Sequence, residues 1–447
     1  MASVAQARLR DAFARAGYTQ ETLSAALRVD QPVGAGAARA NASRLDGTLG
    51  TLARLFLAGE SVPRAAAAEA LDLEAAFAVE LLEGEDEVVA PLAVDEWHGF
   101  YVAHDHEADV VFDHVAGISN ATRTLAALTL RRPARRVLDL GTGCGSQALL
   151  ASRHAEHVVA TDVTERALRV SRLNLQLNDV TNVELRQGSL FEPVAGERFD
   201  LIVSNPPFVV SPDTDLVFRD AGLEGDEISR LVVRGAAEHL EPGGFASMLI
   251  CWAHAADDWP ERVRQWLVGT ACDAWLVRYV SEDPLEYALK WAGEEAAGRW
   301  VDYYEQMSIG TLTTGGLVLR KRAGDGDGWF ATADAETGPT GAASDQIERV
   351  FSAHDFLGDL RAERLGLAPH VLDEQLLWSE GGYRHAHLVA RLDEGAGVAV
   401  PIDPSALRAL FALDGALPVG ELTDVEAALP TIRRLFAAGF VERTNSD

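Results

Sequence analysis

The chain has 447 residues, of which 48% are hydrophobic and 24% charged, and its formal net charge is −29. This length predicts two or three domains, and the composition is that of a soluble globular protein. The negative charge repels phosphate backbones and so counts against tight non-specific binding to nucleic acid. No apolar run approaches the ~18 residues of a membrane span, and the first residues lack the apolar core of a signal peptide. We therefore expect a cytoplasmic protein with no membrane partner.

Residues 1–96 are predicted to form a helix-rich N-terminal domain. Apolar residues recur at helical spacing near the start of the chain, at Leu9, Ala12, Phe13 and Ala16. Thr19 is typical of a residue that begins a helix, and Ser61 with Pro63 predicts the start of another. Residues 87–103 have a strand-like pattern. Several short helices followed by a small sheet favour a winged-helix-like module.

Residues 97–322 alternate between predicted strands and helices. The strands are expected at Arg136–Leu140, His157–Thr161, Val183–Gln187, Leu201–Ser204, Gly244–Cys251, Trp275–Val280 and Gly316–Lys321. The helices are expected at 119–130, 145–154, 164–178, 226–240 and 257–269. This alternation predicts an α/β fold with a doubly wound sheet of seven strands. In that architecture ligands bind beyond the carboxyl ends of the strands, where the strand order reverses.

The C-terminal third begins with residues 323–346, which are rich in Gly, Asp, Ala and Thr and are predicted to form a linker or mobile loop. Residues 347–447 are predicted to form an accessory domain. Helices are expected at 404–413 and 431–439, so that residues 401–443 resemble a small winged helix. Such a module could present a substrate or only cap the catalytic domain.

A glycine-rich loop follows the first predicted strand of the α/β region. Gly141, Gly143 and Gly145 surround Thr142 and Cys144. Glycine adopts backbone torsions closed to other residues and lets a ligand approach the main chain. The spacing is Gly-x-Gly-x-Gly rather than the Gly-x-Gly-x-x-Gly that favours a pyrophosphate, which counts against NAD or FAD. A tight turn without a ligand is the alternative.

The second and third predicted strands also end in polar residues. Asp162 lies 162 − 139 = 23 residues beyond Asp139, and a carboxylate there can accept hydrogen bonds from both hydroxyls of a ribose. Its alternative role is to cap the helix that starts near Thr164. Ser189 could accept a hydrogen bond from an adenine amino group and Leu190 could cover the ring, although a simple turn explains this loop equally well.

The fourth predicted strand ends in Asn205-Pro206-Pro207-Phe208. Prolines remove backbone donors and fix the chain, which leaves the Asn205 side-chain oxygen and the Pro206 carbonyl as convergent acceptors. This pair suits an NH₂ group on a planar carbon, as in an amide or an exocyclic base amine, with Phe208 stacking on the flat group. Catalysis would then consist mostly of positioning and of matching the charge that develops.

The chain contains three cysteines, Cys144, Cys251 and Cys272. Neither a CxxC pair nor a Cys/His ligand spacing occurs in the sequence, so we expect no metal and no disulfide framework. Cys144 is interpreted as a small residue of the glycine-rich loop.

Together these motifs resemble the class I S-adenosylmethionine-dependent methyltransferases, and specifically the NPPY/F group of N-methyltransferases. Within that group the chain is most similar to HemK-like protein glutamine methyltransferases and small-domain RNA guanine N-methyltransferases. The resemblance covers roughly residues 100–322. It rests on Val137–Gly145, Asp162 and Asn205–Phe208, with Phe218–Gly225 and Leu240–Gly244 fitting the same pattern.

The resemblance implies a Rossmann-like methyltransferase sheet with S-adenosylmethionine as cofactor. The backbone from Asp139 to Gly145 would cradle its methionine part, with contacts from Asp139, Gly141, Thr142, Gly143 and Gly145. Asp162 would bind the ribose. Asn205 borders the cofactor and, with Pro206, Pro207 and Phe208, would bind the acceptor amine. The family often has Asp where this chain has Ser189, and residues 114–124 match the family poorly, although Thr122 is a candidate second cofactor contact.

Our first hypothesis is therefore an N-methyltransferase that acts on a planar nitrogen. The acceptor is a protein glutamine or asparagine side chain, or a base amine of RNA or DNA. The acidic balance favours protein, whereas a winged helix favours nucleic acid. A non-catalytic module with a decayed cofactor site and a nucleotide-dependent oxidoreductase are the alternatives from other classes. The intact Asn-Pro-Pro-Phe sequence counts against the first and the glycine spacing against the second.

Overall fold

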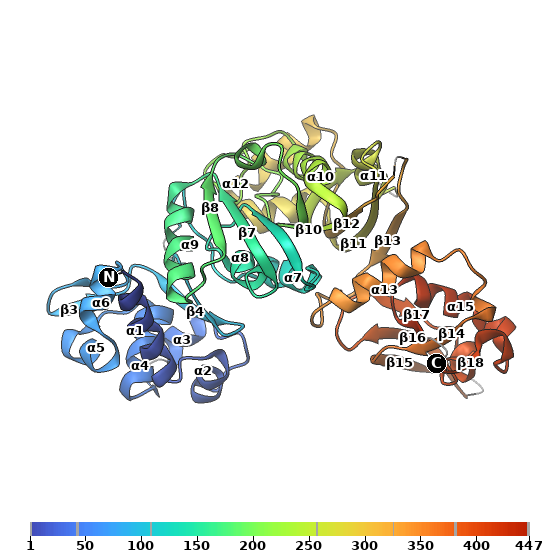
Figure 1. Ribbon diagram of the computed structural model, residues 1–447, viewed down its shortest axis with the longest axis horizontal. Helices are drawn as coiled ribbons and strands as arrows, with labels where there is room; N and C mark the ends of the chain where they lie inside the picture. Colours follow the sequence, from blue (N-terminus) through green and yellow to red (C-terminus); the bar gives the residue numbers. More distant parts are fainter. Residues whose placement is uncertain are drawn as a thin grey trace. The chain divides into compact units, whose positions relative to one another are not determined.

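The computed structural model describes residues 2–444 except 42–43, 108–109, 256–257, 325 and 380–381. The chain divides into two compact units. Figure 1 shows its helices and strands, coloured from the N-terminus (blue) to the C-terminus (red). Unit 1 comprises residues 1–123 and 133–235, and unit 2 comprises residues 124–132 and 236–447. The units cut across the region 97–322 that the sequence pattern predicts as one domain. No helix among the described residues combines the length and the apolar character that a membrane span needs.

The N-terminal part of unit 1 is helix-rich, as predicted. Its helices are α1 (Ala2–Arg15), α2 (Gln20–Leu27), α3 (Ala35–Asn41), α4 (Gly47–Ala53), a π-helical turn at Arg54–Ala58, α5 (Arg64–Ala70) and α6 (Leu73–Ala78). Its strands are β1 (Val62–Pro63), β2 (Glu83–Gly84) and β3 (Glu87–Val89) in the order β1-β3-β2, and a separate hairpin of β4 (Ala93–Trp97) and β5 (Phe100–His104).

Two helix starts were predicted in this part of the chain. Thr19 caps α2, because its side chain accepts a hydrogen bond from Thr22 N at 3.1 Å. The prediction for Ser61 is wrong. Pro63 is the residue before α5, and with Val62 it pairs with β3, so the chain enters the helix from a strand and Ser61 lies too far from the helix to cap it.

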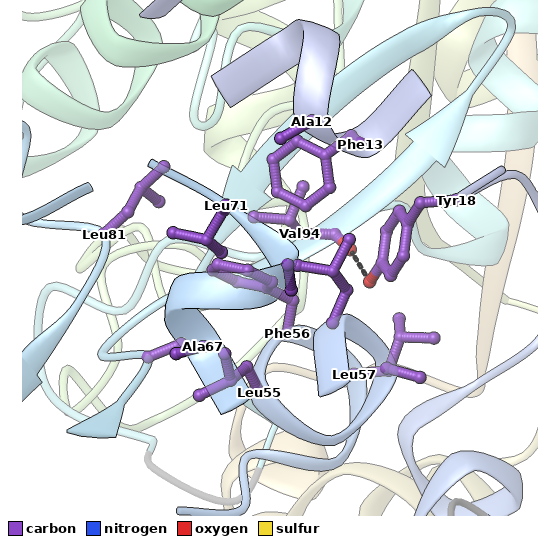
Figure 2. Close-up of a cluster of buried hydrophobic side chains, with 14 of the residues drawn as sticks. Ala12, Phe13, Tyr18, Leu55, Phe56, Leu57, Ala67, Leu71, Leu81 and Val94 are labelled. Carbon is purple, nitrogen blue, oxygen red and sulfur yellow. Dashed lines mark hydrogen bonds between the residues drawn. The ribbon is translucent and has the colours of Figure 1, made fainter. Parts of the chain in front are cut away.

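The buried face of α1 lies in the hydrophobic core of this region, which Figure 2 shows. Leu9, Ala12 and Phe13 are at most 2% exposed, as their helical spacing predicts. The Phe13 ring lies 5.2 Å from the rings of Tyr18 and Phe56 and 4.9 Å from that of Tyr101. Aromatic contacts of this kind contribute stability beyond the area that they bury.

The α/β part of unit 1 contains four parallel strands in the order β9-β6-β7-β8. The strands are β6 (Ala134–Leu140), β7 (Ala155–Asp162), β8 (Val183–Gln187) and β9 (Phe199–Ser204). Helices α8 (Ser146–Ala151) and α9 (Glu165–Leu177) follow β6 and β7. Helix α7 (Asn120–Leu128) precedes β6 and α10 (Glu227–His239) follows β9, and the later residues of both belong to unit 2. Strands β6, β7 and β8 follow one another across the sheet, and β9 then pairs with the opposite side of β6. The strand order therefore reverses between β6 and β9, where this fold class binds its ligands.

Unit 2 contains four further strands in the order β13-β11-β12-β10. They are β10 (Leu240–His254), β11 (Cys272–Glu282), β12 (Thr311–Lys321) and β13 (Phe330–Asp334), with helices α11 (Glu261–Leu267) and α12 (Pro284–Gln306) between them. Strand β12 is antiparallel to β10 and β11, and β13 is parallel to β11. All seven predicted strands form, and the α/β class is confirmed.

Two elements of unit 2 differ from the prediction. Strand β13 lies inside residues 323–346, which were predicted to be a linker, because Phe330–Asp334 pairs with β11 although Gly and Asp dominate the flanking sequence. The long helix α12 was not predicted. Its start is nevertheless encoded locally, since Asp283 accepts from Leu285 N and Glu286 N ahead of Pro284.

The C-terminal part of unit 2 has its own buried core. Its helices are α13 (Ser344–Asp355), α14 (Leu407–Leu410) and α15 (Val425–Ala437). Its sheets are β18 (Asp414–Pro418), β14 (Arg364–Leu367) and β19 (Val441–Arg443) in that order, and β15 (His370–Ser379), β16 (Gly382–Leu392) and β17 (Ala399–Pro401) in that order.

The helices predicted at 404–413 and 431–439 need correction. The first is a 3₁₀ turn at Pro404–Ala406 followed by the single turn of α14. The second is the end of α15, which runs through Pro430 because its apolar face is buried on both sides of the proline, at Ala428, Leu429, Ile432, Leu435 and Phe436. The winged-helix interpretation of both terminal regions stays a prediction.

We predict that Tyr18→Phe lowers the free energy of unfolding by about 1–2 kcal/mol, since the fully buried Tyr18 hydroxyl donates to Val94 O at 2.7 Å (Figure 2). Chemical denaturation measures the change. Tyr383→Phe is the control, because that side chain is 71% exposed. Equal effects of the two substitutions would contradict the assigned role of the Tyr18 hydrogen bond.

Candidate active site

The candidate site lies at the carboxyl ends of β6 and β9, on either side of the point where the strand order reverses. Leu140 pairs with both Thr161 and Ser204 at this edge. The Ser204 hydroxyl also donates to Leu140 O at 3.0 Å, which ties the end of β9 to the end of β6. The glycine-rich loop and Asn205, which follow these two strands, are therefore brought side by side, as the sequence predicted.

The glycine-rich loop is fixed to the end of β7 by its own backbone. Gly141 N and Thr142 N donate to Thr161 O at 3.0 and 2.8 Å. Gly143 has φ +56°, and a Cβ there would have no heavy atom within 4 Å, so the space beside its main chain is open. Gly145 has φ +84°, and its Cβ would lie 3.1 Å from Ser171 Oγ. Gly145 thus serves packing, whereas Gly143 leaves room for a ligand to approach the main chain.

Asp139 lies beneath this loop and is 1% exposed. Its Oδ2 accepts from Thr142 Oγ1 at 2.6 Å and from Ala148 N at 2.9 Å. Burial raises the pKa of Asp139 from 3.8 to about 7, although these two hydrogen bonds oppose the shift, and the charge of Asp162 adds to it. The carboxyl group is consequently close to its titration point at neutral pH, so a cation beside it would favour its ionised form.

Thr122, the candidate second cofactor contact, is 7% exposed. Its hydroxyl donates to Gly117 O at 3.3 Å and lies 3.1 Å from Ser119 Oγ. Its carbonyl accepts from Gln147 Nε2 at 2.9 Å, which joins the start of α7 to α8. These contacts position α7 beside the glycine-rich loop, and the cofactor role of Thr122 stays a prediction.

Asp162 holds the loops of the site together. Its Oδ2 accepts from Gly143 N at 3.0 Å, and its Oδ1 accepts from Thr164 N and Thr164 Oγ1 at 3.0 and 3.1 Å. The cap of α9 is Thr164 itself, whose hydroxyl accepts from Ala167 N at 3.2 Å. Asp162 is half-buried and its carboxylate offers about four acceptor sites, so it can bind a ligand hydroxyl while it keeps these three bonds.

The third loop reaches the same place through the main chain. Gly188 N donates to Asp162 O at 3.0 Å, and Ser189 and Leu190 follow directly. Leu190 has φ +48°, a conformation that costs a non-glycine residue about 1–2 kcal/mol and is found where the surroundings enforce it. Ser189 is exposed and Leu190 half-buried, so both remain available for the predicted adenine contacts.

The acceptor half of the site contains a buried polar atom without a partner. Asn205 Oδ1 is shielded from solvent, and no described residue donates a hydrogen bond to it. Pro206 O accepts from Phe208 N at 2.8 Å and keeps its second lone pair. The two oxygens are the acceptors that the sequence predicted. Phe208 is 9% exposed, so little of its ring is free for the predicted stacking.

The loop after Phe208 is closed by an ion pair to which sequence reasoning gave no role. Asp220, whose side chain is 0% exposed, accepts from Arg219 Nε at 2.8 Å and from Arg219 Nη2 at 2.9 Å. It also accepts from the backbone of Asp215 and Leu216 at 3.2 and 3.1 Å. The bond to Asp220 raises the pKa of Arg219. An adjacent Arg-Asp pair gives no sequence signal of this role, because it depends on the path of the loop.

Comparisons with known proteins concern the part of the chain that contains this site. Residues 106–256 match the family described as "Methyltransferase small domain". The chain is 36% identical over 165 residues to a release factor glutamine methyltransferase of Xylella fastidiosa, covering 33% of this chain and 60% of the relative. It is 31% identical over 182 residues to a ribosomal protein uL3 glutamine methyltransferase of Bradyrhizobium diazoefficiens, covering 37% and 51%.

The match covers only part of each protein. The chain spans 51–60% of the length of these two relatives. Among solved structures, a methyltransferase from Pyrococcus furiosus is similar at 20% identity, with 44% of this chain and 80% of that chain covered and a TM-score of 0.29, which is too low to support a structural argument. The family match and the curated relatives confirm the methyltransferase resemblance that the motifs indicated: residues 106–256 are similar to the methyltransferase small domain.

Proposed function

We propose that the chain is an S-adenosylmethionine-dependent N-methyltransferase whose acceptor is the side-chain amide nitrogen of a glutamine in a protein. The observation that carries this proposal is the buried Oδ1 of Asn205, to which no described residue donates a hydrogen bond, in the residue that precedes Pro206. A buried acceptor without a donor is uncommon in folded proteins and calls for an explanation. The NH₂ group of an amide would supply the missing donor.

The donor half of the site fits the adenosine cofactor, which when bound supplies an electrophilic methyl group. The open space beside Gly143 would let the methionine part approach the main chain, and the buried Asp139 would supply a carboxyl group below the loop. Asp162 would offer its one remaining acceptor site to a ribose hydroxyl. Ser189 and Leu190, which follow the Gly188 hydrogen bond to Asp162, would contact the adenine.

The amide nitrogen of the proposed substrate is a poor nucleophile, and the acceptor loop would make it reactive by holding it in position. The nitrogen lone pair of an amide is delocalised, so the nitrogen must be held on the line of attack. Asn205 Oδ1 and Pro206 O each accept one of its two protons and fix its orientation. The nitrogen would gain positive charge as it bonds to the methyl group and the methyl–sulfur bond breaks, with S-adenosylhomocysteine as the leaving group. The two oxygens would stabilise this charge more strongly in a buried site than in water. The proton would pass to water afterwards, so no base is needed before transfer.

Protein is favoured over nucleic acid as the acceptor by two observations. The curated relatives are named as glutamine methyltransferases of a release factor and of a ribosomal protein. The net charge of −29 opposes contact with a phosphate backbone. A base amine of RNA would fit the same two acceptors, and it is therefore the outcome against which the proposal is tested.

We predict that the enzyme transfers label from methyl-labelled S-adenosylmethionine to a protein in cell extract, and that Asn205→Ala lowers this transfer at least about 100-fold, since a positioning group is lost. Pretreatment with protease should remove the labelled product and ribonuclease should not. Folding of the variant should be unchanged because Asn205 Oδ1 accepts no hydrogen bond from any residue that the structure describes. Label in RNA would contradict the protein acceptor, and full activity of the variant would contradict the role of Asn205.

Asp162→Ala is expected to act on the cofactor first. It removes the proposed ribose contact and the carboxylate that holds Gly143 N and Thr164, so affinity for S-adenosylhomocysteine should fall by about 10–100-fold. Calorimetry of Asp162→Ala beside Asn205→Ala separates the two half-sites, since the second variant should bind the cofactor product like the unsubstituted protein. An equal loss in both variants would mean that the half-sites are misassigned.

The raised pKa of Asp139 predicts a pH dependence with a definite sign. Its folded pKa of about 7 lies above the ordinary 3.8, so its contribution to stability is fully present below about pH 3.8 and is lost as the pH rises through about 7. The ammonium group of the cofactor favours ionised Asp139. Affinity for S-adenosylhomocysteine should therefore rise up to about tenfold from pH 6 to 8. Asp139→Asn should flatten the dependence of both stability and affinity on pH. The same pH dependence in the variant would refute the assignment of the titration to Asp139.

A further inference from the structure

Two segments of unit 1, residues 110–117 and 206–226, contact each other, and the second begins within the candidate acceptor loop Asn205–Phe208. Val217 N, in the loop that follows Asn205–Phe208, donates to Phe112 O at 3.0 Å. The rings of His114 and Phe218 are 5.3 Å apart. The loop of residues 206–226 is therefore in contact with residues 110–117, which precede α7.

Both segments are held in place by ion pairs that involve buried carboxylates. Asp105 is 3% exposed, accepts from Val115 N at 2.7 Å and forms an ion pair with Arg166 in the first turn of α9. The other segment is closed by the buried pair of Arg219 and Asp220 described above. The surface that the two segments present is thus supported by the same elements that form the candidate site, and it is continuous with Asn205–Phe208 along the chain.

This surface exposes apolar side chains. We call the following set the acceptor rim: Val110 (51% exposed), Val111 (45%), Phe112 (63%), Phe218 (40%) and Leu223 (38%). Single exposed apolar residues are common, but several of them on adjoining segments mark a surface that binds something. Their place beside the acceptor loop indicates that they contact the molecule that enters that loop.

The charge around the acceptor rim is one-sided. The described residues of 105–117 and 206–226 include eight Asp and Glu residues and one basic residue, Arg219, which gives 1 − 8 = −7. The charge of Arg219 is neutralised by its bidentate contact with Asp220. Glu107, Asp215 and Glu224 are exposed, so negative charge surrounds the apolar side chains.

We propose that the acceptor rim docks a basic polypeptide segment that carries apolar side chains beside its glutamine. The proposal rests on the function proposed above and specifies its substrate. Lysine or arginine side chains of the segment complement the surrounding carboxylates, which speeds encounter and rejects acidic segments. Its apolar side chains cover Phe112 and Phe218. An RNA strand would place its phosphates against the same carboxylates, which the field opposes.

The probes are short synthetic peptides with one central glutamine. The first has flanking leucines and lysines, the second replaces the lysines by glutamates, and the third replaces the leucines by serines. Fluorescence anisotropy measures binding to the full chain in the presence of S-adenosylhomocysteine, and label from S-adenosylmethionine measures transfer. We expect the first peptide to bind at least about tenfold more tightly than either other peptide and to lose affinity as salt is raised.

Substitutions locate the binding surface. Two variants test the rim: Phe112→Ala, and the double substitution Asp215→Asn with Glu224→Gln. Each should raise the Kd and KM of the lysine peptide about fivefold or more. Affinity for S-adenosylhomocysteine should be unchanged in both. Phe411→Ala is the apolar control, at 72% exposure. Asp302→Asn with Glu294→Gln is the charge control, since both residues are exposed on α12. The controls should leave both constants unchanged.

The possible outcomes distinguish a failure of the docking proposal from a failure of the proposed function. Equal binding of the lysine and glutamate peptides, loss of binding in the controls as well, or displacement of the lysine peptide by a short RNA would overturn the docking proposal. Transfer to extract proteins with binding of none of the peptides would overturn it too. Binding of the lysine peptide to the rim without transfer to any protein would instead refute the proposed function and leave the docking surface in place.

Discussion

The hydrogen bonds of Asp162 are the constraint on which the candidate site depends. One carboxylate oxygen accepts from Gly143 N, the other accepts from Thr164, and the backbone carbonyl accepts from Gly188 N. Three loops that follow three different strands are thereby held at one residue. Charged acceptors make the stronger hydrogen bonds, so this arrangement fixes the loops before any ligand is present. The ribose contact that the motif implies uses acceptor capacity that remains after this structural role is fulfilled.

The acceptor half follows the opposite principle. The fold supplies hydrogen-bond donors to Asp162, whereas Asn205 Oδ1 is buried and accepts from no residue that the structure describes. The Asn-Pro-Pro sequence maintains this condition, because prolines offer no donor of their own and restrict the chain. Under the proposed function, this acceptor would bind the NH₂ group of the substrate amide. The contrast between the two residues is what favours a binding site over a simple turn.

The surroundings of the site add selectivity to this chemistry. The same two acceptors would hold any planar amine, so the amine itself does not identify the molecule that carries it. The apolar and acidic side chains beside the acceptor loop belong to two segments that are far apart in sequence and meet through the contact of Val217 with Phe112. Under the docking proposal, local charge and apolar exposure would supply the discrimination that the acceptor pair lacks.

The sequence by itself determined the α/β class, the positions of seven strands and the loops that carry chemistry. The reason is that strand periodicity, the glycines and Asn205-Pro206-Pro207-Phe208 are local signals. It did not reveal β13, because a five-residue strand is obscured by the Gly and Asp residues around it. It also placed Ser61 at a helix start and began a helix at Thr431, after Pro430, since strand pairing and burial of an amphipathic face override local preference. Only the tertiary structure decided that Asp162 holds Gly143, that no described residue donates to Asn205 Oδ1 and that Phe112 contacts Val217. Each of these facts depends on which distant residues the fold brings within hydrogen-bond distance.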